Sequence, residues 1–214
     1  MHRRKAWYLG VGLVVLWAAA AAAEDAPDGA VPAVFAEIEQ VVLSPEGHQV
    51  SMTTFTVLLA DTRARVEYGS EPGRSGYAEY QIYDFSRMRL YRVFPDDRIY
   101  FEGALSAALA ARAFVEGWGP QPRDLSVRTI PLKDDALSGE PAHLTLVERR
   151  SRRARAPAYT LVWTAVPPGR LPQRVVYTQQ GGHTVVLTYR RVEARAIDAS
   201  NVAVPDAFAN LSPF

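Results

Sequence analysis

The sequence predicts a mainly β protein of the α+β class, in which a curved antiparallel sheet or open barrel contains one helical insert. Short runs rich in valine, threonine and aromatic residues recur along the chain, and glycine, proline and aspartate separate them. One alanine-rich run has both the start and the stop signals of a helix. We expect about nine or ten strands with short antiparallel connections.

The first strands follow a leader rich in small residues and proline. Residues 35–43 are a candidate strand, with a short helix as the alternative, and Ser-Pro-Glu-Gly at 44–47 is a turn signal. Residues 49–59 are rich in valine, threonine and phenylalanine. Charged and apolar side chains alternate through residues 63–68, with the period of two that is typical of a half-buried strand.

This meander continues through residues 78–85 and 87–94, which Ser86 separates. A turn at residues 95–97 leads into a short strand at 98–101. Connections this short join antiparallel neighbours, so we expect these strands to lie side by side in chain order.

A helix is predicted over residues 107–116. Ser106 is a favourable N-cap, and the run that follows is rich in alanine. Leu109 lies on the same helix face as Ala113. Gly117 ends the helix, and the prolines that follow prevent it from resuming.

The second half of the chain returns to strands and closes a single domain over residues 34–214. Gly181 and Gly182 form a hairpin signal between the last two strands. Strands are predicted at residues 125–132, 142–150, 158–165, 171–179 and 184–192.

The N-terminus predicts export. Residues 1–23 have a basic start, an uncharged apolar run and an alanine-rich end, which define a signal peptide with cleavage near Ala23. Residues 24–33 are then a flexible leader of the mature protein. The alternative is a retained membrane anchor, because the apolar run is at the lower limit for a spanning helix. We expect a periplasmic protein without a transmembrane segment after cleavage.

Charge and cysteine content exclude several classes of protein. The chain has 24 Lys and Arg against 23 Asp and Glu, and the signal peptide contains Arg3, Arg4 and Lys5. The mature chain is therefore weakly acidic, which argues against nucleic acid as a partner. The chain has no cysteine. Disulfides, thiol catalysis and thiolate metal sites are excluded, and so is a lipid anchor on a cysteine after the signal peptide.

No catalytic motif is recognisable. His48, His143 and His183 are far apart, without metal-ligand spacing. The chain has no nucleophile-elbow motif, dinucleotide-binding fingerprint or phosphate-binding loop. The acidic pairs at 96–97 and 134–135 are explained as turn residues. We predict a protein that is not an enzyme, with no cofactor and no metal.

Aromatic and aliphatic residues indicate where a ligand would bind. Most such residues fill the core of a β protein, but the inner face of a strongly curved sheet lines an apolar cavity that the helix would cover. From alternation and position, the candidate cavity residues are Phe55, Val57, Tyr80, Ile82, Leu90, Phe94, Leu109, Phe114, Trp118 and Trp163.

An arginine cluster lies at the tip of one predicted hairpin, at Arg149, Arg150, Arg152, Arg153 and Arg155. Such a cluster fits contact with an acidic protein partner or with the phosphate groups of anionic lipid. The alternative is a solvated tip whose charges prevent edge-to-edge pairing of strands.

The order of several short segments resembles the periplasmic outer-membrane lipoprotein carrier superfamily, with the LolA/LolB-like fold, over residues 34–210. The chain is similar to the uncharacterised relatives in particular. The segments are the strands at 78–94 with Pro-Asp-Asp-Arg-Ile-Tyr at 95–100, Leu-Ser-Gly-Glu-Pro-Ala at 137–142, the strand ending at Trp163, Leu-Pro-Gln-Arg at 171–174, and Val-Ala-Val-Pro-Asp-Ala-Phe at 202–208.

This resemblance implies a half-open antiparallel β barrel covered by a helical lid, with an apolar cavity that shields acyl chains from water. We therefore predict a non-enzymatic periplasmic protein that binds a lipid or a lipoprotein acyl chain, with a role in outer-membrane lipoprotein sorting. The alternative is an envelope sensing or assembly module that binds a protein partner through the arginine-rich hairpin.

Overall fold

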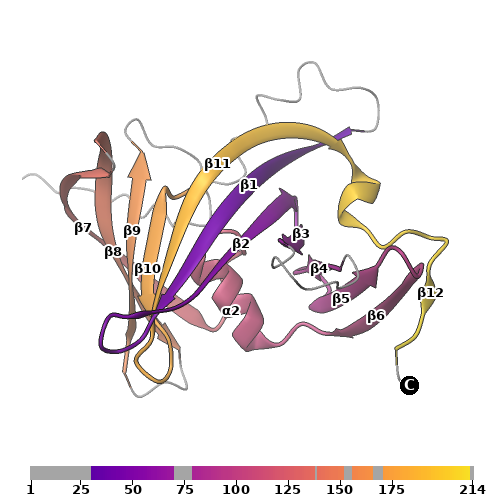
Figure 1. The fold of residues 1–214 in the computed structure, drawn as a ribbon, viewed down its shortest axis with the longest axis horizontal. Coiled ribbons are helices and arrows are strands. Elements are labelled where there is room, and N and C mark those ends of the chain that lie inside the picture. Colours follow the sequence, from indigo (N-terminus) through magenta and orange to yellow (C-terminus); the bar gives the residue numbers. More distant parts are fainter. Residues whose placement is uncertain (1–29, 70–78, 138, 152–155, 166–170, 213–214) are drawn as a thin grey trace, which may run out of the picture.

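A computed structural model describes residues 30–69, 79–137, 139–151, 156–165 and 171–212 (Figure 1). The predicted signal peptide and most of the predicted leader lie outside these residues. The elements are β1 (Ala30–Leu43), β2 (Gln49–Ala60), β3 (Arg63–Tyr68), β4 (Tyr80–Asp84), β5 (Arg89–Phe94), β6 (Ile99–Ala104), α2 (Ala107–Val115), β7 (Leu125–Leu137), β8 (Glu140–Ser151), β9 (Ala158–Ala165), β10 (Arg174–Thr178), β11 (Thr184–Asp198), the 3₁₀ helix η2 (Ala199–Val202) and β12 (Ala209–Asn210).

The strands form one open sheet of 12 strands in the order β12-β6-β5-β4-β3-β2-β1-β11-β10-β9-β8-β7. Every neighbouring pair is antiparallel except β12 and β6, which are parallel. The curved, open antiparallel sheet expected from the sequence is confirmed, with more strands than predicted. Figure 1 shows the sheet bent around α2, so the helix covers part of its concave face.

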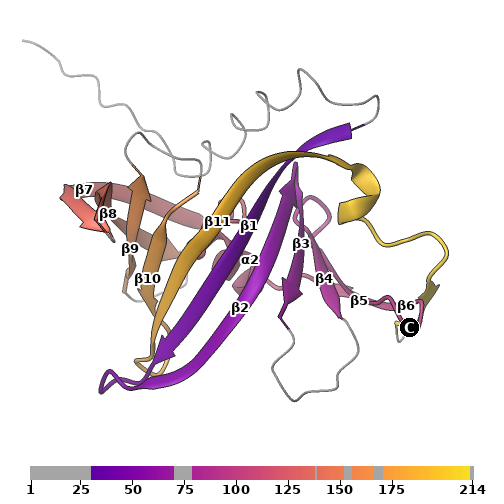
Figure 2. The same ribbon diagram turned by 45° about the horizontal axis from the view of Figure 1, so that its top comes forward.

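The longest strands, β1 and β11, lie side by side at the centre of the sheet (Figure 2). Their pairing runs from Leu43 with Thr184 to Ala30 with Asp198, and its register shifts between Glu37 and Ile38. β1 therefore includes residues 30–33, which the sequence assigned to a flexible leader. Pairing with the extended β11 satisfies the backbone groups of these residues, so they are strand and not leader.

The concave face holds the main core. Alternation places Ala36 and Ile38 of β1 on this side, together with Val57 of β2 and Leu187 of β11. The exposed fraction of each of these side chains is at most 1%. Ala113 of α2 packs against them, and its small side chain lets the helix lie close to the sheet. Full burial of a Val, Leu or Ile side chain stabilises a fold by about 1.5–3 kcal/mol, so this layer fixes the helix on the sheet.

The ends of α2 follow the sequence signals. The Ser106 side chain accepts a hydrogen bond from the backbone N–H of Leu109 at 3.2 Å, as an N-cap does. Gly117 has a φ of +89°, which stops the helix. At Gly119, an added Cβ would lie 2.6 Å from the Cβ of Ala113, so only glycine fits the returning chain there.

The convex face is covered at one end by the C-terminal segment after η2. Val204 and Phe208 of this segment pack against Tyr80, Ile82 and Val93, which point away from the concave side. β12 then pairs with β6, and Leu211 donates its backbone N–H to the carbonyl of Tyr100 at 2.9 Å. The segment thus gives β4 and β5 a second buried face.

Strand β7 corrects one sequence interpretation. It continues through a register shift between Pro131 and Lys133 to Leu137, so Asp134 and Asp135 lie in an edge strand and not in a turn. An edge strand tolerates proline because one side of its backbone has no neighbouring strand to receive hydrogen bonds.

The turn between β4 and β5 depends on Asp84, whose side chain is 2% exposed. Its carboxylate accepts hydrogen bonds from Arg63 Nε at 3.2 Å, Ser86 Oγ at 2.7 Å and the backbone N–H of Arg87 at 2.9 Å. Burial disfavours the ionised carboxylate, but these hydrogen bonds and the charge of Arg63 hold the pKa of Asp84 below its usual value. The ionised carboxylate therefore stabilises the folded state.

We expect Asp84→Asn to lower the free energy of unfolding by about 1–3 kcal/mol, because the amide does not replace the charged acceptor. Because the pKa of Asp84 is lowered in the folded state, the ionised carboxylate contributes its full stabilisation above about pH 4. As the pH falls below that value, the difference in free energy of unfolding between the variant and the original protein should decrease. Denaturant unfolding at several pH values measures it. Asp97→Asn, at an exposed turn, is the control. A difference that does not change with pH would contradict this role of the carboxylate.

Candidate functional site

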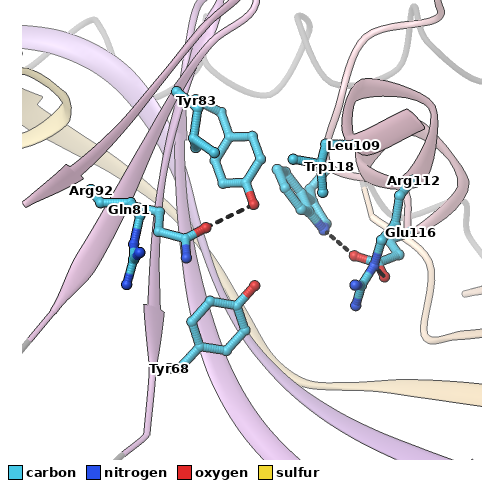
Figure 3. Close-up of a pocket in the computed structure, with 9 residues that line it drawn as sticks. Tyr68, Gln81, Tyr83, Arg92, Leu109, Arg112, Glu116 and Trp118 are labelled. Atoms are coloured by element: carbon cyan, nitrogen blue, oxygen red, sulfur yellow. Dashed lines mark hydrogen bonds and ion pairs between the residues drawn. The ribbon is translucent and has the colours of Figure 1, made fainter. Parts of the chain in front are cut away.

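A pocket of about 350 Å³ lies between α2 and the concave side of β3, β4 and β5 (Figure 3). It combines aromatic, aliphatic and polar side chains. The lining residues are Tyr68, Gln81, Tyr83, Leu90, Arg92, Leu109, Arg112, Glu116 and Trp118.

The sheet side of the pocket follows from strand register. Gln81 pairs with Arg92 and Tyr83 pairs with Leu90, so these four side chains stand together on the concave face. The Tyr83 hydroxyl donates a hydrogen bond to Gln81 Oε1 at 3.0 Å. Tyr68, at the end of β3, adds an aromatic ring to the same wall (Figure 3).

The helix side follows from helical spacing. Arg112 follows Leu109 by three residues, and Glu116, the C-cap of α2, follows Arg112 by four. This spacing places the three side chains on one face of the helix. Trp118 comes directly after Gly117 and returns over the pocket, where its ring meets that of Tyr83 edge-on, with ring centroids 5.1 Å apart. An edge-to-face contact of this kind stabilises beyond its buried area by about 0.5–1.5 kcal/mol.

The Glu116 carboxylate joins the helix to the sheet. Its side chain is 2% exposed, and it accepts hydrogen bonds from Arg112 Nε at 2.6 Å, Trp118 Nε1 at 3.1 Å and the Tyr177 hydroxyl at 2.9 Å. The Tyr189 hydroxyl donates to the backbone carbonyl of Glu116. Because Tyr177 is on β10 and Tyr189 on β11, one residue fastens the C-terminal end of α2 to two strands.

The charges in this cluster reinforce one another. Burial, followed by the charge of Glu116, raises the pKa of Tyr177 above its usual value, and the same two causes raise the pKa of Tyr189. Burial alone would lower the pKa of Arg112, but its ion pair with Glu116 raises it. The tyrosines therefore remain neutral hydrogen-bond donors, and Arg112 remains a cation.

Arg112 also reaches the central strand, where its Nη2 donates to Gln40 Oε1 of β1 at 3.1 Å. At the other side of the pocket, Arg92 makes two hydrogen bonds to the Glu79 carboxylate, at 2.7 Å and 2.9 Å. The hydrogen bond from Arg92 lowers the pKa of Glu79, so this pair is ionised as well. Each arginine of the pocket thus has its own carboxylate.

The structure brings together part of the cavity expected from the sequence. Leu90, Leu109 and Trp118 line the pocket. Phe55 and Val57 belong to the concave core on the neighbouring strand β2, where the ring of Phe55 lies 5.6 Å from that of Tyr68.

Two further expected residues lie elsewhere on the helix side of the sheet. Phe94 has the same parity on β5 as Arg92, but its ring packs edge-on against Phe101 of β6, 5.8 Å away. Phe114 is buried on α2, outside the pocket lining.

Three expected residues lie on the opposite face. Tyr80 and Ile82 point to the convex side, beneath the C-terminal segment. Trp163 also faces away, because its neighbour Val162 pairs with Val175 of the concave core. Its indole N–H donates instead to Asp135 at 3.3 Å. Successive side chains of a strand point to opposite faces, so a position's place in this alternation determines which face its side chain lies on. In these strands, apolar residues occupy positions on both faces.

The arginine-rich hairpin is only partly within the described residues, because Arg152, Arg153 and Arg155 lie outside them. Arg149 lies on the same face of β8 as Val147, and burial lowers the pKa of the Arg149 guanidinium. The side chain of Arg150 is 64% exposed, and its Nη2 lies 3.6 Å from a carboxylate oxygen of Glu148.

Sequence reasoning missed the polar half of the pocket, which is Tyr68, Gln81, Tyr83, Arg92, Arg112 and Glu116. One signal was present, because Arg112 and Glu116 have the spacing of an ion pair on a helix. No group of acidic or histidine side chains among the described residues could hold a metal ion. Over the same residues, no helix is long and apolar enough to cross a bilayer.

The sequence matches no protein-family model, and no curated protein matches it. Among solved structures, it is similar to a LolA superfamily protein from Nitrosomonas europaea, with 11% identity and a TM-score of 0.44 over 86% of this chain and 94% of that one. It is also similar to a chain of the Pseudomonas aeruginosa MucA/MucB complex, with 11% identity and a TM-score of 0.41, over 92% of this chain and 62% of that one. For the Mycobacterium tuberculosis lipoprotein LppX, the identity is 10% and the TM-score 0.37, over 83% and 92% of the two chains.

One of the structures to which this chain is similar is thus a member of the superfamily that the sequence resembles. With identities near 10% and TM-scores below 0.5, these likenesses assign no function.

We expect Glu116→Gln to lower the free energy of unfolding by about 3 kcal/mol, near the lower end of the range for a broken buried ion pair, because Arg112 is partly exposed. In this variant, backbone amides of α2 should also exchange with deuterium faster than they do in the original protein. Those of β8 should exchange at their original rate, since the loss is local to the helix.

The matched control is Glu148→Gln, whose partner Arg150 is exposed, and whose effect on unfolding should stay below about 1 kcal/mol. Unchanged exchange in α2 of the Glu116→Gln variant would show that the carboxylate does not hold the helix on the sheet.

Proposed function

We propose that this protein is a non-enzymatic binding protein that holds the hydrocarbon chain of an amphiphile in the pocket beneath α2. The position of the pocket carries this proposal, since a half-covered hollow on the concave side of a curved sheet combines an apolar wall with polar groups. Its volume of about 350 Å³ is within the range of small-molecule sites.

The wall supports binding of a chain. Leu90 of β5 and Leu109 of α2 both line the pocket, and Trp118 lies beside Leu109 (Figure 3). Each methylene group that moves from water onto such a surface contributes about 0.8 kcal/mol. Phe55 and Val57 form a close-packed layer on the neighbouring strand, so the chain would lie across the pocket wall and not pass through the sheet.

The acyl chains of lipids and lipoproteins belong to this class of ligand. The signal peptide expected at residues 1–23 would direct the protein to the periplasm, and the sequence resemblance supports a role in outer-membrane lipoprotein sorting.

Filling the pocket with a larger side chain tests the proposal. Leu109→Trp should weaken binding of dodecyl glucoside to the purified protein by about tenfold, because the new indole would occupy the space of the chain. Displacement of an environment-sensitive apolar dye measures the affinity, and solvent extraction followed by mass spectrometry identifies any lipid that copurifies.

Leu132→Trp is the control, because Leu132 lies on the edge strand β7 and is 48% exposed. Equal affinity in the two variants would place the ligand elsewhere. A protein that neither binds the dye or glucoside nor copurifies with lipid would contradict the proposed function.

A further inference from the structure

The charges around the pocket are balanced in pairs. Among the described residues, Arg112 and Arg92 are the cationic groups of the lining, and each binds a carboxylate at short distance. The Arg92 pair uses both oxygens of Glu79, and the Arg112 pair uses Nε with Oε1 of Glu116. Neither pair leaves an excess charge for a ligand to neutralise.

An anionic head group would be disfavoured here. Each guanidinium already binds a carboxylate, and an anion added at its remaining N–H groups would give the pocket, which includes the buried Glu116, a net negative charge. An uncompensated buried charge is strongly destabilising. Displacing Glu79 from Arg92 would exchange one bidentate carboxylate for another and still add a net negative charge to the pocket.

A cationic head group has no open carboxylate to bind. Both oxygens of Glu116 accept hydrogen bonds, Oε1 from Arg112 and Tyr177 and Oε2 from Trp118. A second cation beside Arg112 would be repelled, and the side chain of Glu116 is 2% exposed, so a solvated ammonium group cannot approach it.

The remaining polar groups of the wall are uncharged. The Gln81 amide and the hydroxyls of Tyr68 and Tyr83 line the pocket (Figure 3). Burial raises the pKa of both tyrosines, so each hydroxyl keeps its proton. The Tyr83 hydroxyl donates its proton to Gln81 and offers its oxygen as an acceptor, whereas the Tyr68 hydroxyl can both donate and accept. Groups of this type pair with ligand hydroxyls, which also donate and accept.

Resting on the proposed function, we infer that the pocket selects an amphiphile whose head group is uncharged and bears hydroxyls, and that it rejects anionic and cationic amphiphiles of the same chain length. A glyceryl ester and a glycosyl ether are the two sources of this chemistry. The head group would contact Gln81 and Tyr68, and the chain would lie along Leu90 and Leu109.

Probes with one common chain separate the charge classes. Monolauroyl glycerol, dodecyl glucoside, laurate and dodecyltrimethylammonium are titrated into the full chain by calorimetry, below their critical micelle concentrations. At least one of the two uncharged probes should bind about tenfold more tightly than either charged probe. The ratio between the glycerol ester and the glucoside then tells which neutral head group fits better.

A variant reverses the selection. Glu79→Gln removes the carboxylate that neutralises Arg92, so the affinity for laurate relative to monolauroyl glycerol should rise by about tenfold. Glu39→Gln is the matched control, since it also removes a carboxylate bound to an arginine, Arg190 at 2.8 Å, but from an outward position on β1. In the Glu39→Gln variant, the affinity for laurate relative to monolauroyl glycerol should equal that of the original protein.

The outcomes distinguish the two proposals. If none of the four probes binds, amphiphile binding itself fails, and the inference fails with it. If laurate or dodecyltrimethylammonium binds as tightly as the uncharged probes, or if Glu79→Gln leaves the ratio unchanged, amphiphile binding stands and the inference about the head group is overturned.

Discussion

The carboxylate of Glu116 is the constraint on which the concave side of this protein depends. A buried charge must be compensated, and here the partners come from the helix, from the returning chain and from β10. Satisfying one group therefore fixes the end of α2, the position of Trp118 and the wall of the pocket together. The same compensation leaves the pocket electrically balanced, which links the stability of the fold to the kind of molecule it can hold.

Much of the fold was predictable because local chemistry specified it. The Ser106 side chain caps the start of the helix, and the backbone of Gly117, at positive φ, ends it. Gly181 and Gly182, both at positive φ, lie in the predicted turn between β10 and β11. The antiparallel pairing of β2 with β3, and the order of β4, β5 and β6, followed from their short connections. The start of β1 was missed because residues 30–33 become a strand only through pairing with β11, a partner far away in sequence.

The site was less predictable, and β4 shows why. Tyr80 and Ile82 alternate with Gln81 and Tyr83, and three of these four side chains are buried. The C-terminal segment covers one side of this strand, so hydrophobicity does not tell which parity faces the pocket. Apolar character alone favoured Tyr80 and Ile82, which face the convex side, and it gave no weight to the ion pair of Arg112 with Glu116. The spacing of Arg112 and Glu116 was visible in the sequence, but only tertiary packing buries it.

The pairing of β1 with β11 has a consequence for how the chain acquires its shape. These neighbours come from opposite ends of the folded region, and the cover over β4 and β5 comes from residues that follow β11. Contacts between distant parts of a chain form slowly, because a large loop must close before they stabilise anything. The hairpins on either side can assemble early, but the curved sheet is complete only when the last stretch of polypeptide is available.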